Sequence, residues 1–190
     1  MKTLYLFRHA ETSWNEIHKL QGRTDIHLSL TGIRQAKNAK KMINKLKIDI
    51  CYVSPLKRAL ETTNIILEDK NIPLIIHEGL VERDFGIYEG KVLNNYDELI
   101  NFHDKLDFNG ESNKDAAIRM KETLLDIVNN CEYDHILIST HGGLISYFID
   151  LAYEENNSKE RFNYKHLENC SINVVKYDEG IFIPTGEYIK

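Results

Sequence analysis

The sequence is poor in the features that mark secreted and membrane proteins. It has only three cysteines, which lie far apart and include no CxxC pair. A disulfide framework or a cysteine-rich zinc site is therefore not expected, and a reducing compartment fits. The apolar stretch at residues 4–7 is too short for a signal-peptide core. No later run approaches the roughly 18 apolar residues of a membrane span. We expect a cytoplasmic protein with no membrane partner.

Positive charge is also scarce. The 24 lysines and arginines are outnumbered by 29 aspartates and glutamates, for a net charge of −5 at pH 7. An acidic chain is a poor general binder of nucleic acid, so no nucleic-acid partner is expected and any cationic site must be local. Only three prolines occur, and no low-complexity tract or linker interrupts the 190 residues. We expect one domain over residues 1–190, with an oligomeric state that the sequence does not indicate.

Short apolar runs alternate with helical patterns along the chain. Strands are predicted at residues 3–7, 48–54, 72–80 and 135–140, and a closing hairpin at 171–178 and 181–184. Helices are predicted at residues 30–46, 96–106, 113–130 and 144–151. Another helix is expected after residue 54, with Ser54 as N-cap and Pro55 at the first helical position. This alternation predicts an α/β fold, a three-layer αβα sandwich whose mostly parallel sheet carries helices on both faces.

Charged side chains follow these predicted strands at the point where each strand ends. Arg8 and His9 follow the first strand, Arg58 lies in the first turn of the helix after the second, and Glu82 follows the third. His141 follows the strand at 135–140 and precedes two glycines. Ligands of open α/β sheets bind outside the carboxyl ends of the strands, so we expect these five residues to converge.

The combination suits chemistry on a phosphate group. Two arginines match phosphate oxygens, and helix N-termini near Ser54 and Gly142 add backbone N–H groups. Asn15 adds a neutral donor. A neutral histidine can attack phosphorus while a second histidine stabilises the developing charge. Glu82 is suited to protonate the leaving oxygen.

Each residue also has an ordinary structural explanation. Arg58 could pair with Glu61 one turn further along its helix, and Glu82 could pair with Arg83 or Lys91. The two glycines could form a plain turn. The joint pattern is more specific than its parts because each member independently follows a predicted strand.

Seven segments in order resemble the histidine phosphatase superfamily, also called the phosphoglycerate mutase-like family. They span nearly the whole chain: LFRHAETSWN, LQGRTDIHLSLTGIRQA, SPLKRALET, LVERDFGIYEG, FNGESNKDAAIRM, ISTHGGLI and LENCSINVVKYD. One departure is Asn109, where relatives often carry proline or glycine. The resemblance implies the αβα fold and an enzyme that needs no metal or other cofactor.

The resemblance also implies a role for each matched residue. His9 would be the nucleophile that becomes phosphohistidine, and Glu82 the proton donor and later the base. The phosphoryl group would be held by Arg8, Arg58, His141, Asn15 and the Gly142 amide. Gln21 and Gly22 would border the substrate.

Within the family, three features favour a phosphatase, a hydrolase of small phosphomonoesters. The chain between Glu82 and His141 is short, which leaves little room for the long insertion of mutases. The segments LQGRTD and ERDFGIYEG are closer to those of small phosphatases, including α-ribazole phosphatases and metal-independent phosphoserine phosphatases. The alternatives are a cofactor-dependent phosphoglycerate mutase and a non-catalytic phosphate-binding regulatory module. A metallohydrolase is disfavoured because no HxH or HExxH spacing occurs.

The substrate itself is not determined by these motifs. Side chains that could line its pocket are Trp14, His18, Arg23, His27, Phe85, Tyr88 and His103. The histidines at 77, 135 and 166 are interpreted as structural.

Overall fold

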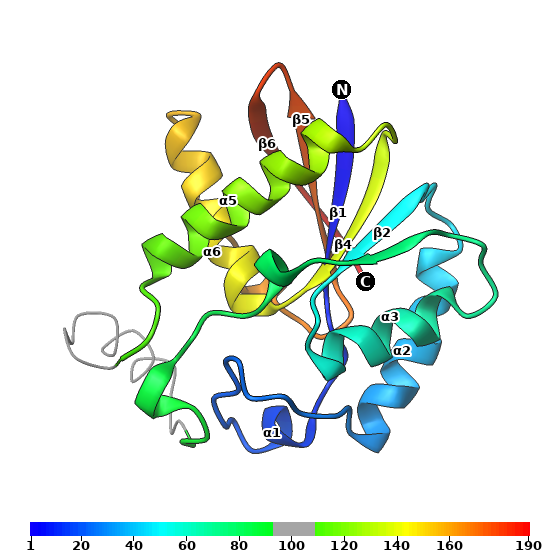
Figure 1. Cartoon of the computed structure of the whole chain (residues 1–190), viewed down its shortest axis with the longest axis vertical. Helices are drawn as coiled ribbons and strands as arrows, with labels where there is room; N and C mark the ends of the chain where they lie inside the picture. The colour runs from blue at the N-terminus through cyan, green and yellow to red at the C-terminus, as the bar shows by residue number, and fades with distance from the viewer. Residues whose placement is uncertain (93–108) are drawn as a thin grey trace.

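A computed structural model describes residues 1–92 and 109–190 of the chain. Its centre is a six-stranded sheet in the order β3-β2-β4-β1-β5-β6 (Figure 1). The strands β1, β4, β2 and β3 run parallel, whereas β5 is antiparallel to both β1 and β6. The strand bounds are Lys2–Arg8, Ile50–Val53, Leu74–Ile76, His135–Thr140, Ile172–Asp178 and Ile181–Ile189 for β1 to β6.

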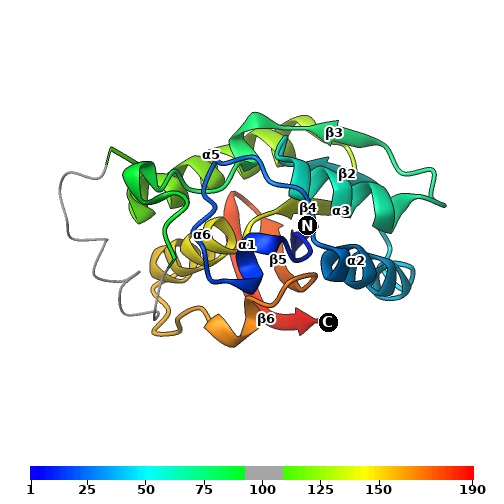
Figure 2. The ribbon, with the colours of Figure 1, turned by 90° about the horizontal axis from the view of Figure 1, so that it is seen from below.

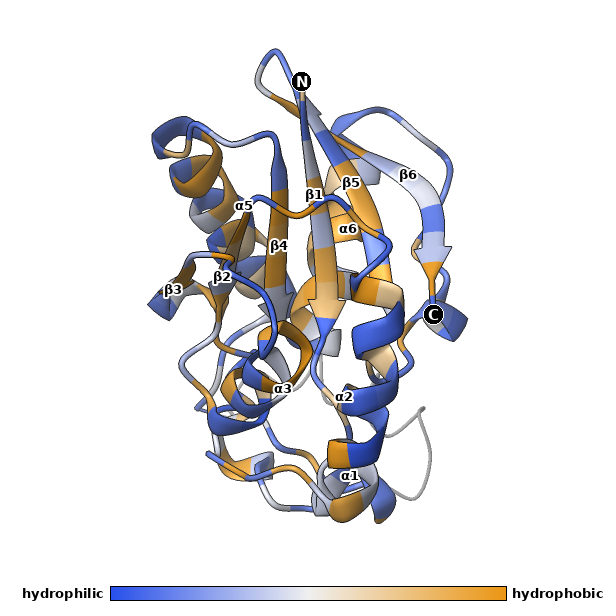
Figure 3. Cartoon of the chain, turned by 90° about the vertical axis from the view of Figure 1, so that its right-hand side faces the viewer, coloured by the Kyte–Doolittle hydropathy of each residue, from blue (hydrophilic) through white to orange (hydrophobic). Residues whose placement is uncertain are grey.

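Helices cover both faces of this sheet. The bounds are Leu30–Ile43 for α2, Lys57–Leu67 for α3, Asn113–Asn130 for α5 and Gly142–Glu155 for α6. Side chains alternate along β1, so Leu4 and Leu6 join a core with α5 and α6, whereas Phe7 joins a core with α2 and α3. Figure 3 shows the apolar residues concentrated along β1 and β4. The predicted three-layer αβα architecture is confirmed.

Short elements complete the described chain. Helix α1 spans Ser13–Glu16, and 3-10 turns span Glu78–Leu80, Gly86–Tyr88 and Tyr164–His166. Within residues 1–92 and 109–190, no helix is both long and apolar enough to cross a bilayer. The helix predicted at residues 96–106 lies outside the described residues.

The central elements agree best with the sequence. Strand β4 and helix α5 have the bounds predicted for them. Helix α6 begins two residues earlier than predicted, at Gly142. The strand predicted over residues 72–80 was wrong in extent, because only Leu74–Ile76 pairs with β2. This strand lies at the sheet edge, so its apolar side chains are exposed, and the chain turns into a 3-10 helix directly after it.

The predicted start of α3 was also wrong. The helix begins at Lys57 with Leu56 as N-cap, and no side-chain hydrogen bond caps it. Leu56 has an extended conformation, with φ −68° and ψ 135°. The Ser54 hydroxyl instead contacts the ring of His141, 2.8 Å away. The same hydroxyl accepts from Leu56 N at 3.3 Å, so Ser54 contacts the chain just before α3 but is not its N-cap.

Several turns use the left-handed region of backbone space, and two of them bear on the sequence analysis. Glu179 and Gly180 connect β5 to β6 with φ of 46° and 89°, as a tight hairpin requires. Strand β6 continues to Ile189, beyond the predicted end at residue 184. Asn109 has a φ of 50°. Asparagine and glycine adopt this region most readily, so Asn109 is compatible with a loop where relatives often carry glycine.

Helix α2 packs tightly against the chain that follows β1. The Gln35 side chain accepts from Glu11 N at 3.0 Å, and Ser29 N donates to Glu11 O at 3.0 Å. At Gly32, a Cβ would overlap the carbonyl oxygen of Glu11. Gly32 thus lets α2 hold the backbone two residues beyond His9.

We expect Gly32→Ala to destabilise the protein. In an unconstrained helix this change adds about 1 kcal/mol of stability, but here the new methyl group meets a backbone oxygen. We predict a loss of about 1–3 kcal/mol in the free energy of unfolding, as for other overpacked sites. Urea unfolding of the variant is compared with Lys37→Ala, an exposed position of the same helix. A Gly32→Ala variant more stable than the parent would contradict this packing.

Candidate active site

The register of β1 and β4 brings two histidines together. Arg8 lies opposite Thr140, so His9 and His141 leave neighbouring parallel strands at the same edge. Their ring centroids are 5.2 Å apart, and His9 N donates to Thr140 O at 3.1 Å. Figure 2 views this edge from below, where α1 lies between α6 and α2. The convergence expected from the strand ends is present.

His9 is held as a neutral ring with a free nitrogen lone pair. Its Nδ1 lies 2.7 Å from the carbonyl oxygen of Ala10. A carbonyl can only accept, so Nδ1 carries the proton and Nε2 carries the lone pair. The side chain is 3% exposed. Burial, together with the charges of Arg58 and Arg8, lowers the pKa of His9 well below its usual value.

Arg58 is a buried cation next to this ring. It is 1% exposed, and its guanidinium donates to Gly22 O at 2.6 Å and to Thr24 O at 2.9 Å. Burial lowers the pKa of Arg58 to about 10, which leaves it charged at neutral pH. Its Nε is buried without a partner among the described residues. Glu61 does not hold Arg58, because its carboxylate contacts His27 and the Leu28 amide.

His141 is fully buried and neutral. Burial is the main cause that lowers its pKa, followed by the positive charge of Arg58, the electrostatic effect of the neighbouring His9 ring and the positive charge of Arg8. Its Nε2 lies 2.8 Å from the Ser54 hydroxyl. Its Nδ1 is buried without a partner in residues 1–92 and 109–190. When Ser54 donates to Nε2, the Nδ1 proton remains available to an anion in the site.

Glu82 binds the N-terminus of α6. Its Oε1 accepts from Arg83 N and Leu144 N, both at 2.9 Å, and its Oε2 accepts from Gly143 N at 3.1 Å. The two glycines lie close to charged side chains. A Cβ on Gly142 would lie 3.0 Å from Arg8 Nε, and one on Gly143 would lie 2.9 Å from Glu82 Oε1. The small size of the glycine pair therefore allows Arg8, Glu82 and the N-terminus of α6 to lie close together.

Asn15, Gln21 and Gly22 border the same space. Asn15 Oδ1 accepts from Thr12 N at 3.0 Å, so its Nδ2 group remains a donor. Gln21 Oε1 is buried with no partner in the described chain. Gly22 has a φ of 52°, and a Cβ there would overlap the Glu89 carboxylate. The nine site residues predicted from the sequence are thus gathered at one edge of the sheet.

Three residues that support the site were not predicted. Glu89 accepts from Arg23 N at 2.7 Å and from Phe85 N at 3.3 Å, which joins two loops of the site. Arg119 donates to Gly79 O at 2.7 Å and Val81 O at 3.0 Å, and so holds the segment before Glu82.

The third is Asn169, which donates to His9 O at 2.9 Å. In the sequence, Asn169 is marked only by its position in the family-like segment LENCSINVVKYD. That segment does not indicate which backbone atom the side chain binds.

A cavity of about 340 Å³ lies over these residues. Of the seven side chains that could line a substrate pocket, Phe85 is in the described lining. Trp14, His18, Arg23, His27 and Tyr88 are not in the described lining, and His103 lies outside the described residues. Lining residues that the sequence did not suggest are Lys19, Leu20, Ser146, Tyr147 and Leu167.

The three remaining histidines make structural contacts. His77 Nδ1 accepts from Gly79 N at 3.1 Å and caps a 3-10 turn. His135 stacks on Tyr5 with 6.5 Å between ring centroids, and His166 stacks on Tyr188 at 4.3 Å. Among the residues that the structure describes, no group of three or more His, Cys, Asp or Glu could hold a metal ion.

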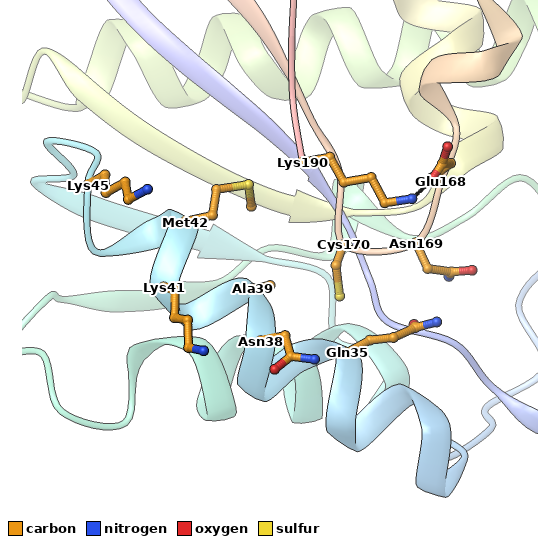
Figure 4. Close-up of a pocket in the computed structure, with 10 residues that line it drawn as sticks. All are labelled: Gln35, Asn38, Ala39, Lys41, Met42, Lys45, Glu168, Asn169, Cys170 and Lys190. Carbon is orange, nitrogen blue, oxygen red and sulfur yellow. Dashed lines mark ion pairs between the residues drawn. The ribbon is translucent and has the colours of Figure 1, made fainter.

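A second cavity lies beside helix α2 and residues 168–170. It measures about 630 Å³, and helix α2 and residues 168–170 contribute to its lining (Figure 4). None of the nine predicted site residues lines it. Gln35 and Asn169 do line it, and they hold Glu11 N and His9 O respectively. Side chains that line this second cavity therefore hold the backbone of His9 and Glu11 through hydrogen bonds.

Comparison with known proteins identifies the same family that the sequence motifs resemble. Residues 4–184 match the model of the histidine phosphatase superfamily (branch 1). The "Uncharacterized phosphatase PhoE" of Bacillus subtilis (strain 168) is 34% identical over 76% of this chain and 74% of its own length. The "Probable phosphoglycerate mutase GpmB" of Enterobacter sp. (strain 638) is 28% identical over 98% of this chain and 90% of its own.

A solved structure is similar over nearly the whole chain. It is a mutant of phosphoserine phosphatase from Entamoeba histolytica in complex with phosphoserine, 32% identical, with a TM-score of 0.78. The match covers 99% of this chain and 96% of that one. This chain belongs to the histidine phosphatase superfamily.

Proposed function

We propose that this protein hydrolyses a phosphomonoester of a small metabolite through a phosphohistidine on His9. The observation that carries the proposal is the state of the His9 ring. Its Nδ1 is tied to Ala10 O at 2.7 Å and its pKa is lowered, so Nε2 presents a lone pair at physiological pH. Two arginines stand beside it in a cavity of about 340 Å³. A neutral nucleophile among fixed cations suits attack on a phosphate dianion.

In the first step, the Nε2 lone pair forms a bond to phosphorus while the bond from phosphorus to the ester oxygen breaks. Glu82, in its protonated form, gives its proton to that oxygen, and the alcohol leaves. Arg8, Arg58, His141, Asn15 and the Gly142 amide hold the phosphoryl oxygens. The Ala10 carbonyl accepts from the His9 Nδ1 proton, which stabilises the positive charge on the phosphorylated ring.

In the second step, water attacks the phosphorus and gives a proton to the Glu82 carboxylate. The bond from phosphorus to Nε2 breaks, and its electron pair returns to the ring. Inorganic phosphate leaves, and both His9 and Glu82 regain their starting forms. Glu82 therefore serves as acid and then as base from one position, where three backbone N–H groups hold its carboxyl.

A phosphatase and a mutase differ in the molecule that takes the phosphoryl group from the phosphohistidine, which is water in a phosphatase and a bound acceptor in a mutase. A mutase must exclude water until a bound acceptor takes the group back. The short chain between Glu82 and His141 supports hydrolysis, as does the likeness to relatives named as phosphatases. Relatives named as mutases keep transfer as the second candidate. A regulatory module that only binds phosphate would not need Glu82 beside the nucleophile.

Three further statements are part of the proposal. Its partner is a small phosphomonoester and not a nucleic acid, as the acidic chain suggests. Turnover needs no metal or other cofactor, because Arg8, Arg58 and His141 already balance the phosphoryl charge. The compartment is the cytoplasm, which three buried free cysteines support.

The first test compares hydrolysis with transfer. We expect phosphate release from a panel of small phosphomonoesters in the presence of EDTA. With phosphoglycerate as substrate and 2,3-bisphosphoglycerate to load the enzyme, release should exceed interconversion of the 2- and 3-isomers. Interconversion faster by orders of magnitude would identify a mutase, and activity lost in EDTA but restored by Mg²⁺ or Zn²⁺ would identify a metallohydrolase.

The second test concerns Glu82. An alkoxide needs a proton to leave, whereas p-nitrophenolate does not, so Glu82→Gln should slow the phosphorylation step of an alkyl phosphate by roughly 10²–10⁴-fold. The loss with p-nitrophenyl phosphate should be much smaller. Single-turnover kinetics measure both, with Glu16→Gln as a matched control because Glu16 is exposed and outside the described cavity lining. Equal losses on the two substrates would assign Glu82 a structural role.

A further inference from the structure

The peptide group between Ala10 and Glu11 sets the orientation of the His9 ring. Its carbonyl oxygen accepts from Nδ1 of His9 at 2.7 Å, and its N–H donates to Oε1 of Gln35 at 3.0 Å. This peptide bond is trans, so the two polar groups point in opposite directions from one rigid plane. A side chain of α2 therefore fixes the direction of the carbonyl that holds the nucleophile.

The preceding peptide group, between His9 and Ala10, is also held by side chains. Its N–H donates to the hydroxyl of Thr62 at 3.0 Å, and its carbonyl oxygen accepts from Asn169 at 2.9 Å. Thr62 is fully buried in α3, and its hydroxyl donates to the carbonyl oxygen of Arg58 at 2.6 Å. Because a hydroxyl has one proton, this arrangement leaves its oxygen to accept from Ala10. Helices α2 and α3 thus hold two consecutive peptide groups beside the nucleophile.

The Ala10 carbonyl determines which nitrogen of His9 can attack phosphorus. A neutral imidazole carries one ring N–H, and the hydrogen bond at one nitrogen determines where that proton lies. With the proton on Nδ1, Nε2 has a lone pair, whereas a ring protonated on Nε2 cannot attack through that atom. The bond to Ala10 also strengthens during the reaction, because the ring gains positive charge as Nε2 bonds to phosphorus. Donation from Glu11 N to Gln35 polarises the peptide and makes its carbonyl a better acceptor.

We propose that Gln35 and Thr62 are positioning residues that keep the proton of His9 on Nδ1. Neither is in the described lining of the site cavity, and both act through the backbone on either side of Ala10. The inference rests on the proposed function, because it takes His9 as the nucleophile. The phosphate-binding residues are unchanged by the loss of either side chain. The effect therefore falls on the chemical step and not on substrate binding.

The first measurement locates the His9 proton. Full-length protein labelled with ¹⁵N-histidine is examined by NMR, and the His9 signals are identified by their absence in His9→Ala. Wild type should show a ring protonated on Nδ1. Gln35→Met and Thr62→Val keep a similar side-chain volume but remove the polar contact, so a population protonated on Nε2 should appear in both. This measurement needs no substrate and no turnover.

The second measurement is the rate of phosphorylation in a single turnover of p-nitrophenyl phosphate. Gln35→Met and Thr62→Val should each lower the saturating rate constant by roughly 10- to 100-fold, as small displacements of reacting groups do. The substrate concentration for half-saturation should stay within about twofold of wild type. Gln35→Glu keeps an acceptor for Glu11 N and should retain most of the rate.

Two control variants separate positioning from packing. Thr63→Val removes an equally buried hydroxyl from the next residue of α3, which lies 2.8 Å from Ala59 O and 2.7 Å from Ser139 Oγ. Asn38→Met changes an exposed side chain of α2 that lines the second cavity together with Gln35. Both controls should phosphorylate at the wild-type rate with the proton on Nδ1, whatever their stability in urea.

A wild-type tautomer and rate in both Gln35→Met and Thr62→Val would overturn the inference. Equal losses in the two control variants would also overturn it, because they would show a general loosening of the packing. Either result leaves the proposed function standing, since the wild-type protein still turns over. A wild-type protein that hydrolyses no phosphomonoester would instead overturn the proposed function, and the NMR comparison would still test the positioning of the ring.

Discussion

The register of the parallel pair β1–β4 is the constraint on which the site depends. Because Arg8 lies opposite Thr140, His9 and His141 emerge side by side. The end of β4 also anchors the neighbouring loops, since Thr140 Oγ1 donates to Leu80 O at 2.7 Å, and Ser54 N donates to Ser139 O at 3.0 Å. A slip of one residue would turn the side chains of β1 to the opposite face and separate these groups.

Burial then decides the charge states at this edge. Burial lowers the pKa of Arg58 to about 10, which still leaves the guanidinium charged at neutral pH, and two carbonyl oxygens accept from it. The two histidines lose theirs, because desolvation and the neighbouring arginines both disfavour imidazolium. A locally cationic site thus exists in a protein of net charge −5, and it consists of fixed donors around the neutral ring of His9. Such an arrangement is complementary to an anion and costs little reorganisation when charge develops.

Sequence reasoning succeeded where a local rule applied. Apolar runs and strand–helix alternation predicted the sheet, and the strand-end rule placed His9, Glu82 and His141 at one edge. Sequence reasoning failed where tertiary contacts determine which group a side chain binds. Ser54 has the chemistry of an N-cap, but the packing of β2 against β4 presents it to His141. Lys19 has no distinguishing local pattern, and only the folded loop places it over Trp14 in the wall of the site cavity.

The central claim is that His9 carries the phosphoryl group, and trapping the phosphoenzyme tests it most directly. Wild-type protein is mixed with ³²P-labelled substrate and quenched within milliseconds. The account predicts label that is stable in base, labile in acid and located on His9 by peptide mapping. His9→Ala should carry no label, whereas His27→Ala, at an exposed histidine that pairs with Glu61, should label as wild type does. Label that persists in His9→Ala, or turnover without it, would contradict the account.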